Sequence, residues 1–223
     1  MADNDSPWWT QHEQSREDPR IGVLHIKVRT APRRPALSLE VALAYALAAL
    51  AGGPADDLKR AFARMDEDEI GGAYRQTLEA AAECDGAAEG FREAFHLAWT
   101  VRGFRHRAAL QDDALFLRAF RRIFPPYQGE PLILYRGERT SELEAGRIGF
   151  NWSTKEGVGR MFASGLCTTY GGDGVLLRAS AAPQAILSGP NDHSANWLGE
   201  MEHIVDPAML TDVIEIARFP PSA

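Results

Sequence analysis

The chain has 223 residues, 45% of them hydrophobic and 25% charged, and a net charge of −7 at pH 7. Such values are typical of a folded globular protein and argue against global disorder. The negative charge argues against a surface built as a whole to hold nucleic acid or anionic lipid. Cys84 and Cys167 stand far apart without metal-ligating neighbours, so we expect two free thiols in a reducing cytoplasm.

Residues 1–20 are polar and lack the apolar core of a signal peptide, so we expect a mobile N-terminal tail. Its adjacent Trp8 and Trp9 are expected to pack on the chain or to engage a partner. The next ten residues, IGVLHIKVRT, favour a short strand. No stretch reaches the ~18 uninterrupted apolar residues of a membrane span, so we expect no membrane partner.

Apolar residues recur at helical spacing from Ser38 to Phe124. Ser38 is in the right place to cap a first, alanine-rich core helix, which Gly52, Gly53 and Pro54 would end. Four further helices are expected in the segments DDLKRAFARM, AYRQTLEAAAEC, FREAFHLAWTVRGF and DDALFLRAFRRIF.

The pattern changes near residue 128 to short β-type runs separated by Gly, Asn, Asp and Pro. The expected strands are LILYRG, GFNWST, GVLLRAS, QAILS, EHIVD and DVIEIARF, with one helix after Thr154. The sequence therefore predicts an α+β protein in three parts: the tail 1–20, a mainly helical region 21–127 and a second domain 128–223.

Two acids, Glu200 and Glu202, stand just before an apolar run that Pro207 ends. In an extended strand alternate side chains share a face, so both carboxylates would point the same way. Like charges at that spacing repel each other and give a structural strand nothing. We therefore expect the pair to serve a chemical purpose.

Three short motifs stand out in the second domain: Tyr135-Arg136-Gly137, Trp152-Ser153-Thr154 and the Glu200-x-Glu202 pair, which Trp197 precedes. Taken singly, each has a structural explanation. Arg136 could form a surface ion pair, Ser153 and Thr154 could cap the following helix, and Trp197 could pack in the core.

Taken in this order, the three motifs resemble those of the ADP-ribosyltransferases of the Arg-Ser-Glu class. The resemblance covers about residues 131–219 and implies a split β-sandwich catalytic domain after the helical region. Lys155 stands where that family carries the last serine of its Ser-Thr-Ser motif.

The resemblance implies cleavage of the nicotinamide–ribose bond of NAD, which serves as co-substrate, and transfer of ADP-ribose to an acceptor. Glu202 would stabilise the oxocarbenium-like ribose, and Ser153 would orient Glu202. Arg136 would bind the NAD phosphates, with Gly137 allowing close approach and Tyr135 and Thr154 beside it. Trp152, Phe162 or Tyr170 would form a wall for the nicotinamide ring.

Glu at position 200 resembles the arginine-modifying members, so the expected acceptor is an arginine of a target protein. Glu200 would take the proton from the attacking guanidinium, and Trp197 would contact the acceptor. The activity would be that of a mono-ADP-ribosyltransferase acting as a toxin or effector, in the cytoplasm or delivered into a target cell, with an inhibitor or antitoxin as a further partner. Three alternatives stay open: an NAD glycohydrolase, a transferase that modifies nucleic acid, and a non-catalytic binding module.

The six histidines form no pair at metal-ligand spacing, so we expect no metal site. A basic run in the helical region contains Arg102, Arg105, His106 and Arg107, followed by Arg118, Arg121 and Arg122. It is expected to be a solvated face, with acceptor docking or nucleic-acid binding as the alternative.

Overall fold

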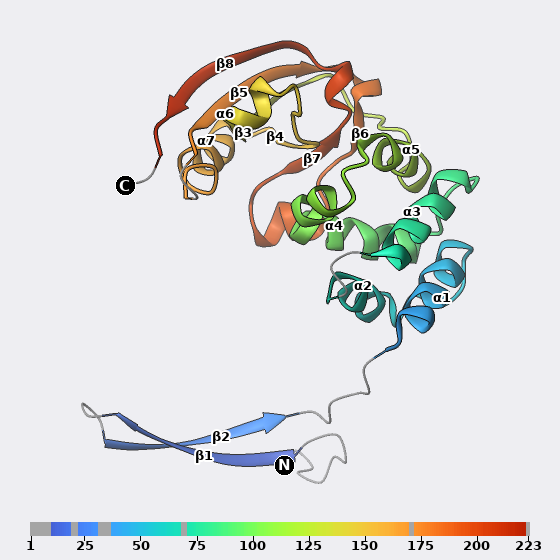
Figure 1. Ribbon diagram of the computed structural model, residues 1–223, viewed down its shortest axis with the longest axis vertical. Helices are drawn as coiled ribbons and strands as arrows, with labels where there is room; N and C mark the ends of the chain where they lie inside the picture. The colour runs from blue at the N-terminus through green and yellow to red at the C-terminus, as the bar shows by residue number, and fades with distance from the viewer. Residues whose placement is uncertain (1–9, 19–21, 31–36, 68–70, 170–171, 222–223) are drawn as a thin grey trace. The chain divides into compact units, whose positions relative to one another are not determined.

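The computed structural model describes residues 10–18, 22–30, 37–67, 71–169 and 172–221. The chain divides into two compact units, Met1–Leu37 and Ser38–Ala223 (Figure 1). Trp8, Trp9 and Tyr170, which the sequence singled out, lie outside the described residues.

The first unit contains an antiparallel pair of strands, β1 (Thr10–Asp18) and β2 (Gly22–Thr30). The sequence predicted β2, but it did not predict a strand in the expected tail. The residues of β1 are polar and show no apolar alternation, whereas the ladder from Thr10 opposite Thr30 to Asp18 opposite Gly22 follows the main chain. Because backbone hydrogen bonds need no particular side chain, composition alone did not reveal this strand.

The second unit begins with the five expected helices. They are α1 (Leu39–Leu50), α2 (Leu58–Glu67), α3 (Gly72–Glu83), α4 (Glu89–Leu110) and α5 (Asp113–Ile123). Ser38 caps α1 as predicted, because its Oγ accepts a hydrogen bond from Val41 N at 3.2 Å. Only one face of α1 is buried; Val41, Tyr45 and Leu47 are each more than one-third exposed.

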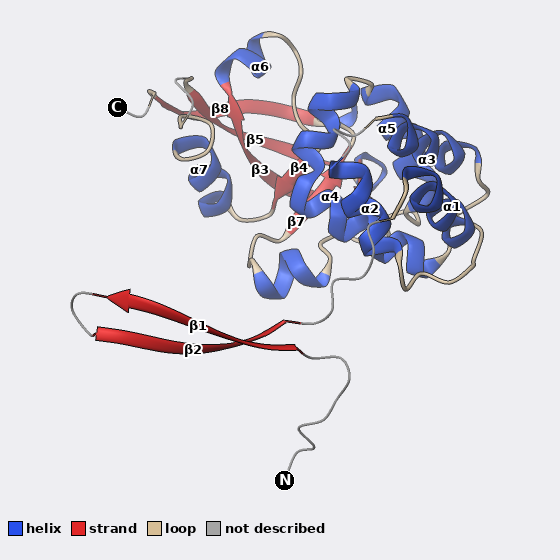
Figure 2. Cartoon of the chain, turned by 60° about the horizontal axis from the view of Figure 1, so that its bottom comes forward, coloured by secondary structure: helices blue, strands red, loops and turns tan. Residues whose placement is uncertain are grey.

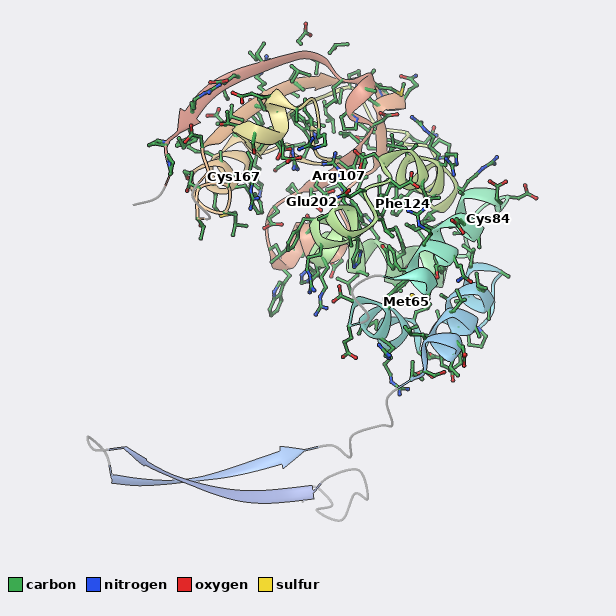
Figure 3. The ribbon with its side chains drawn as sticks, in the orientation of Figure 1. Met65, Cys84, Arg107, Phe124, Cys167 and Glu202 are labelled. Carbon is green, nitrogen blue, oxygen red and sulfur yellow. The ribbon has the colours of Figure 1, made fainter. Side chains whose placement is uncertain are left out.

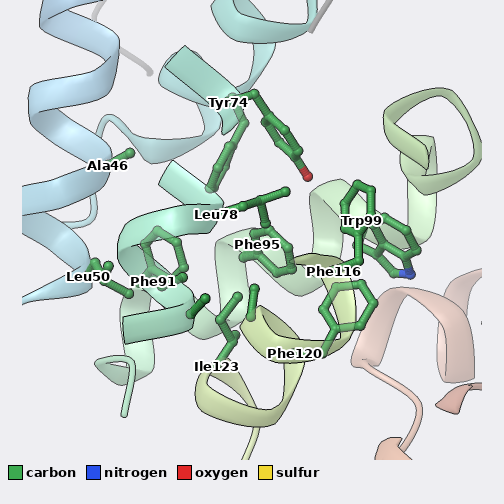
Figure 4. Packing of buried hydrophobic residues seen from close by; sticks show 14 of the residues in the cluster. Ala46, Leu50, Tyr74, Leu78, Phe91, Phe95, Trp99, Phe116, Phe120 and Ile123 are labelled. Atoms are coloured by element: carbon green, nitrogen blue, oxygen red, sulfur yellow. The ribbon is translucent and has the colours of Figure 1, made fainter. Parts of the chain in front are cut away.

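The helices share an aromatic core in which rings of α4 and α5 interdigitate (Figure 4). Trp99 of α4 meets Phe120 of α5 edge to face, with the ring centres 4.8 Å apart. The same core includes Phe150, Leu187 and Ile204, which belong to the strand-rich part of the chain. The two parts therefore fold around a common core, and the change of pattern near residue 128 does not separate two compact units.

All six strands predicted after residue 128 are present, and they form one antiparallel sheet with the order β6-β7-β4-β3-β5-β8 (Figure 2). The strands are β3 (Leu132–Arg139), β4 (Asn151–Ser153), β5 (Gly174–Ala181), β6 (Ile186–Ser188), β7 (Glu202–Val205) and β8 (Thr211–Phe219). The expected helix after Thr154 is α7 (Glu156–Ser164), and a short helix that was not predicted, α6 (Thr140–Glu144), follows β3.

The unit is thus an α+β fold, as predicted. The described strands of residues 132–219 form one continuous sheet, whereas the resemblance implied two. Cys84 and Cys167 are both free thiols. Within the described residues, none of the helices combines the length and apolar character needed to cross a bilayer.

Candidate active site

Strand β4 brings one residue from each of the three motifs together. Ser153 lies opposite Glu202 of β7 on one side and opposite Tyr135 of β3 on the other. Directly opposed residues of antiparallel strands have side chains on the same face. Ser153, Glu202 and Tyr135 therefore share one face of the sheet.

This face is covered by different helices at its two ends. Ile204, which lies opposite Asn151 and so shares the face, packs into the core formed by α4 and α5. At the other end α7 lies against β3, close to Tyr135. Ser153 and Glu202 are located between these two regions, and Figure 3 shows Glu202 in the middle of the unit, near α4.

Glu202 is held at both its backbone and its side chain. Its N–H donates to Ser194 Oγ at 2.8 Å, and its Oε1 accepts from Asn151 Nδ2 at 2.8 Å. Burial raises the pKa of this carboxyl from 4.5 to about 7; the Asn151 hydrogen bond and Arg136 oppose the rise, and the charge of Glu200 adds to it. A carboxyl group that titrates near neutral pH is typical of catalytic acids and bases.

The backbone between Glu200 and Glu202 has a conformation that the sequence did not predict. Strand β7 begins at Glu202, so Glu200 lies outside it, and Met201 between them has a φ of 50°. The expectation that strand alternation places both acids on one face was therefore wrong. A left-handed conformation is costly for methionine and occurs often at functional sites. Burial raises the pKa of Glu200 as well, and His193 opposes this rise.

Ser153 fixes the loop that carries the acids. Its hydroxyl donates to the carbonyl oxygen of Glu200 at 2.5 Å and accepts from Lys155 N at 2.9 Å. Lys155 also contacts this loop, because its Nζ donates to the carbonyl oxygen of Gly199 at 2.8 Å. Lys155 thus has a positioning contact of its own.

Arg136 does not join this group. It follows Tyr135 in β3 and lies opposite Leu177, so its side chain belongs to the other face of the sheet. There Nε donates to Glu138 at 2.7 Å and one terminal nitrogen donates to the carbonyl oxygen of Asn151 at 2.6 Å. The expected convergence of Arg136 with Ser153 and Glu202 is therefore wrong for Arg136. It forms an ion pair with Glu138, but this pair is largely buried, whereas the structural explanation placed it at the surface.

Gly137 and Trp152 also have structural roles in place of the expected contacts with NAD. A Cβ at Gly137 would lie 2.5 Å from the carbonyl oxygen of Gly159 in α7, so the space beside this glycine is filled by a helix. Trp152 is buried on the face opposite Ser153, and its Nε1 donates to the carbonyl oxygen of Gly149. It packs in the second core of the unit and cannot form a wall for a ring next to Ser153.

The remaining expected site residues differ in exposure. Tyr135 and Thr154 are partly buried next to Ser153 in the chain or in the sheet, and Phe162 is partly buried on α7. Trp197, in the π-helical turn His193–Trp197 just before the acids, is 80% exposed, so its core-packing alternative is wrong. His203 is buried on the opposite face from Glu202, as expected.

Most arginines of the basic run are exposed, as expected of a solvated face, whereas His106 is buried. Several members of the run are also paired with acids. Arg102, Arg105 and His106 all lie around the buried carboxylate of Asp66. In addition, Arg107 pairs with Asp113 and Arg121 with Asp206, each at 2.6 Å.

Asn151 and Ser194 are the residues of the candidate site that the sequence did not predict. Both contact Glu202 directly, and both are small polar residues of types that commonly occur in loops and strand ends. Asn151 stands two positions before Ser153, so a strand reading could have placed it on the same face. No comparable signal marks Ser194.

Two cavities of about 580 and 290 Å³ lie away from this group. The larger is bordered by Arg121, Tyr127 and Ile186 and the smaller by Leu132 and Thr211; neither is lined by Ser153 or Glu202. Within the described part of the chain, no three His, Cys, Asp or Glu residues are grouped so as to hold a metal ion.

No protein-family model, curated protein or solved structure matches this chain.

Proposed function

We propose that the protein is an NAD-dependent mono-ADP-ribosyltransferase whose reactive centre is Glu202 with Ser153 and Glu200. The observation that carries the proposal is the register between β4 and β7, which sets Ser153 directly opposite Glu202, a partly buried glutamate with a raised pKa. The fold proposed is a relative of the ADP-ribosyltransferase split β-sandwich, supported by the adjacent positions of the motif strands β3, β4 and β7.

In the proposed reaction the bond between nicotinamide and ribose breaks, and the ribose develops positive charge. Ionised Glu202 faces this charge, and it stabilises the transition state more than the ground state because the charge is absent from bound NAD's ribose. Ser153 keeps the acid-bearing loop in place through the carbonyl oxygen of Glu200. Arg136 acts indirectly, by holding the backbone of Asn151 from the far face.

The proposed acceptor is an arginine side chain of another protein. Glu200 lies two residues before Glu202, is partly buried and has a raised pKa, as suits a base that takes a proton from the attacking guanidinium. Trp197 and Leu198 are exposed just before the acids and offer apolar contact to a macromolecule. A role as a toxin or effector, and an inhibitor or antitoxin partner, remain part of this proposal.

The proposal is tested by incubating the protein with labelled NAD and a cell lysate, and measuring both released nicotinamide and label in macromolecules. Glu202→Ala should lose both signals by at least about a hundredfold, the scale of one transition-state contact. Glu200→Gln should keep nicotinamide release and lose the label. An active Glu202→Ala protein would contradict the assignment.

The same assay, together with calorimetry of NAD binding, separates the alternatives. Nicotinamide release without label in any macromolecule would identify an NAD glycohydrolase. Label removed by nuclease but not by protease would identify a nucleic-acid acceptor, and calorimetry showing no NAD binding would leave a binding module.

The release of nicotinamide should also increase with pH through about 7, because Glu202 must be ionised to stabilise the ribose cation.

A further inference from the structure

The helical region reaches the candidate site through a chain of two hydrogen bonds. Trp99, in the middle of α4, donates its indole N–H to Asn151 Oδ1 at 2.8 Å. The amide nitrogen of the same Asn151 donates to Glu202 Oε1, also at 2.8 Å. Trp99 is 2% exposed and is packed among Phe116, Phe120 and Phe150, so its position is fixed by the core.

The chemistry of Trp99, Asn151 and Glu202 fixes which group donates and which accepts in each of the two hydrogen bonds. An indole can only donate, so the amide of Asn151 must turn its oxygen to Trp99 and its NH₂ to Glu202. The oxygen of Glu202 that faces Asn151 must then be an acceptor. This arrangement suits the ionised carboxylate in particular, because hydrogen bonds from neutral donors to a charged acceptor are the stronger kind.

The next residue of α4, Thr100, is linked to the backbone of Glu202 by a second series of hydrogen bonds. Thr100 Oγ1 accepts from Asn191 Nδ2 at 2.9 Å, and Asn191 Oδ1 accepts from Ser194 N at 2.8 Å. Ser194 Oγ in turn accepts from the backbone N–H of Glu202. Two consecutive residues of α4 are therefore linked to the side chain and to the backbone of one glutamate.

We propose that Trp99 is a positioning residue for Glu202, which it orients and keeps ionisable by fixing the amide of Asn151. The effect on catalysis rests on the function proposed above, whereas the effect on the ionisation of Glu202 does not. The other charged groups that act on Glu202 are Glu200 in the preceding loop and Arg136 on the far face. A substitution at Trp99 leaves both of these residues in the chain, so their charges act on Glu202 in the variant as well.

The test is a pH titration of Glu202 by NMR in protein labelled with ¹³C-glutamate, without NAD, with the signal assigned from Glu202→Gln. In Trp99→Phe the amide is free to turn its oxygen toward a protonated carboxyl. The midpoint should then rise by about 1 pH unit, as expected from loss of one hydrogen bond to a charged group. Trp152→Phe is the matched control, because it also removes one buried indole hydrogen bond, but on the opposite face. It should leave the midpoint where it is.

A second measurement needs no change in the core. In the wild-type protein, the ¹⁵N–¹H signal of the Trp99 indole should follow the titration of Glu202, and this response should vanish in Glu202→Gln. The Trp152 indole should not follow it. An unchanged midpoint in Trp99→Phe, or a Trp99 indole signal insensitive to the titration, would overturn the proposal; if Trp99→Phe does not fold, the indole signal decides.

The result is separable from that of the proposed function, because neither measurement involves NAD. If Trp99 affects the titration of Glu202 in a protein that releases no nicotinamide, the proposed enzymatic function is refuted and the positioning role of Trp99 is supported. Nicotinamide release by a protein in which Trp99 does not affect the titration of Glu202 would support the enzyme and refute the positioning role of Trp99. If both hold, the pH dependence of nicotinamide release in Trp99→Phe should move upward together with the Glu202 midpoint.

Discussion

At the scale of single residues, the same sheet holds two glutamates, Glu202 and Glu138, whose pKa values are shifted in opposite directions. Glu202 has a hydrogen bond from a neutral amide and a second acid beside it, so burial dominates and its pKa rises to about 7. Burial alone would also raise the pKa of Glu138. There, however, the Arg136 guanidinium and the N–H groups of Gly149 and Arg139 outweigh burial and hold the pKa below its usual range.

This difference predicts how the stability of the protein changes with pH. Because the pKa of Glu202 is higher in the folded than in the unfolded state, its contribution to stability is present below 4.5 and is lost as pH rises through about 7. Glu202→Gln keeps the acceptor for Asn151 and removes the buried charge. It should raise the free energy of unfolding at pH 8 by up to about 3 kcal/mol, at about 1.4 kcal/mol per pH unit, and by little at pH 4.5. Thermal unfolding at both pH values measures this.

Glu138→Gln is the control of opposite sign. The pKa of Glu138 is lowered in the fold, so its contribution is present at neutral pH and is lost under acid conditions. The substitution leaves Arg136 without its counter-charge and should cost about 2 to 3 kcal/mol at pH 8, somewhat less than a fully buried pair because Arg136 stays 20% exposed. Equal responses of the two variants to pH would show that the two carboxyl groups do not differ in this way.

At the scale of elements, β3 and α7 approach so closely that glycines are needed on both sides. A Cβ at Gly159 would lie 3.1 Å from Tyr135 Cβ of β3, and one at Gly137 would lie 2.5 Å from the carbonyl oxygen of Gly159. Gly137→Ala should therefore push α7 away from the sheet and destabilise the unit by about 3 kcal/mol, at the upper end for overpacking. Denaturant unfolding measures the change.

Gly157 provides the matched control in the same helix. Nothing lies within 4 Å of a Cβ at this position, and its backbone needs no left-handed conformation. Gly157→Ala should thus stabilise α7 by up to about 1 kcal/mol through helix propensity alone. Similar unfolding curves for the alanine variants at 137 and 157 would argue against the close packing of α7 on β3.

The elements themselves could be predicted from the sequence, because apolar spacing and turn residues encode them locally. The second-unit helices and strands anticipated from these patterns are all present, with α6 in addition. Their relative register could not be predicted in this way. Whether Tyr135 or Arg136 faces Glu202 depends on which residue of β3 lies opposite Ser153, and two neighbouring residues of a strand give opposite answers.

The candidate site could be predicted only in part, because the sequence shows residue types but not strand register. Ser153 and Glu202 could be predicted because the motifs consist of particular residue types. The register of β4 and β7 places these two residues opposite each other. The left-handed Met201 between the acids, the helix that fills the space at Gly137 and the Asn151 contact all arise from tertiary structure. None of them changes the local pattern from which the sequence was interpreted.

At the scale of the whole molecule, the boundary suggested by the change of pattern near residue 128 differs from the boundary between compact units. Residues 1–37 form one unit and 38–223 the other. Within the second unit, Phe150 before β4 contacts aromatic rings of both α4 and α5, and Ile204 of β7 belongs to the same core. The sheet therefore depends on the helices for much of one face.

Two fragments test this division. Residues 38–223 should unfold in a single cooperative transition with nearly the thermal midpoint of the full chain, because the core clusters and the sheet lie within them. Residues 128–223 should show no cooperative transition, since this fragment exposes Phe150, Leu187 and Ile204 and leaves Asn151 without Trp99. Losing burial of three large apolar side chains alone costs about 5 kcal/mol or more, comparable to the whole stability of a typical domain. Circular dichroism and calorimetry on both fragments measure the outcome, and a cooperatively folded 128–223 would mean that the helical region is an accessory to the sheet and not part of its core.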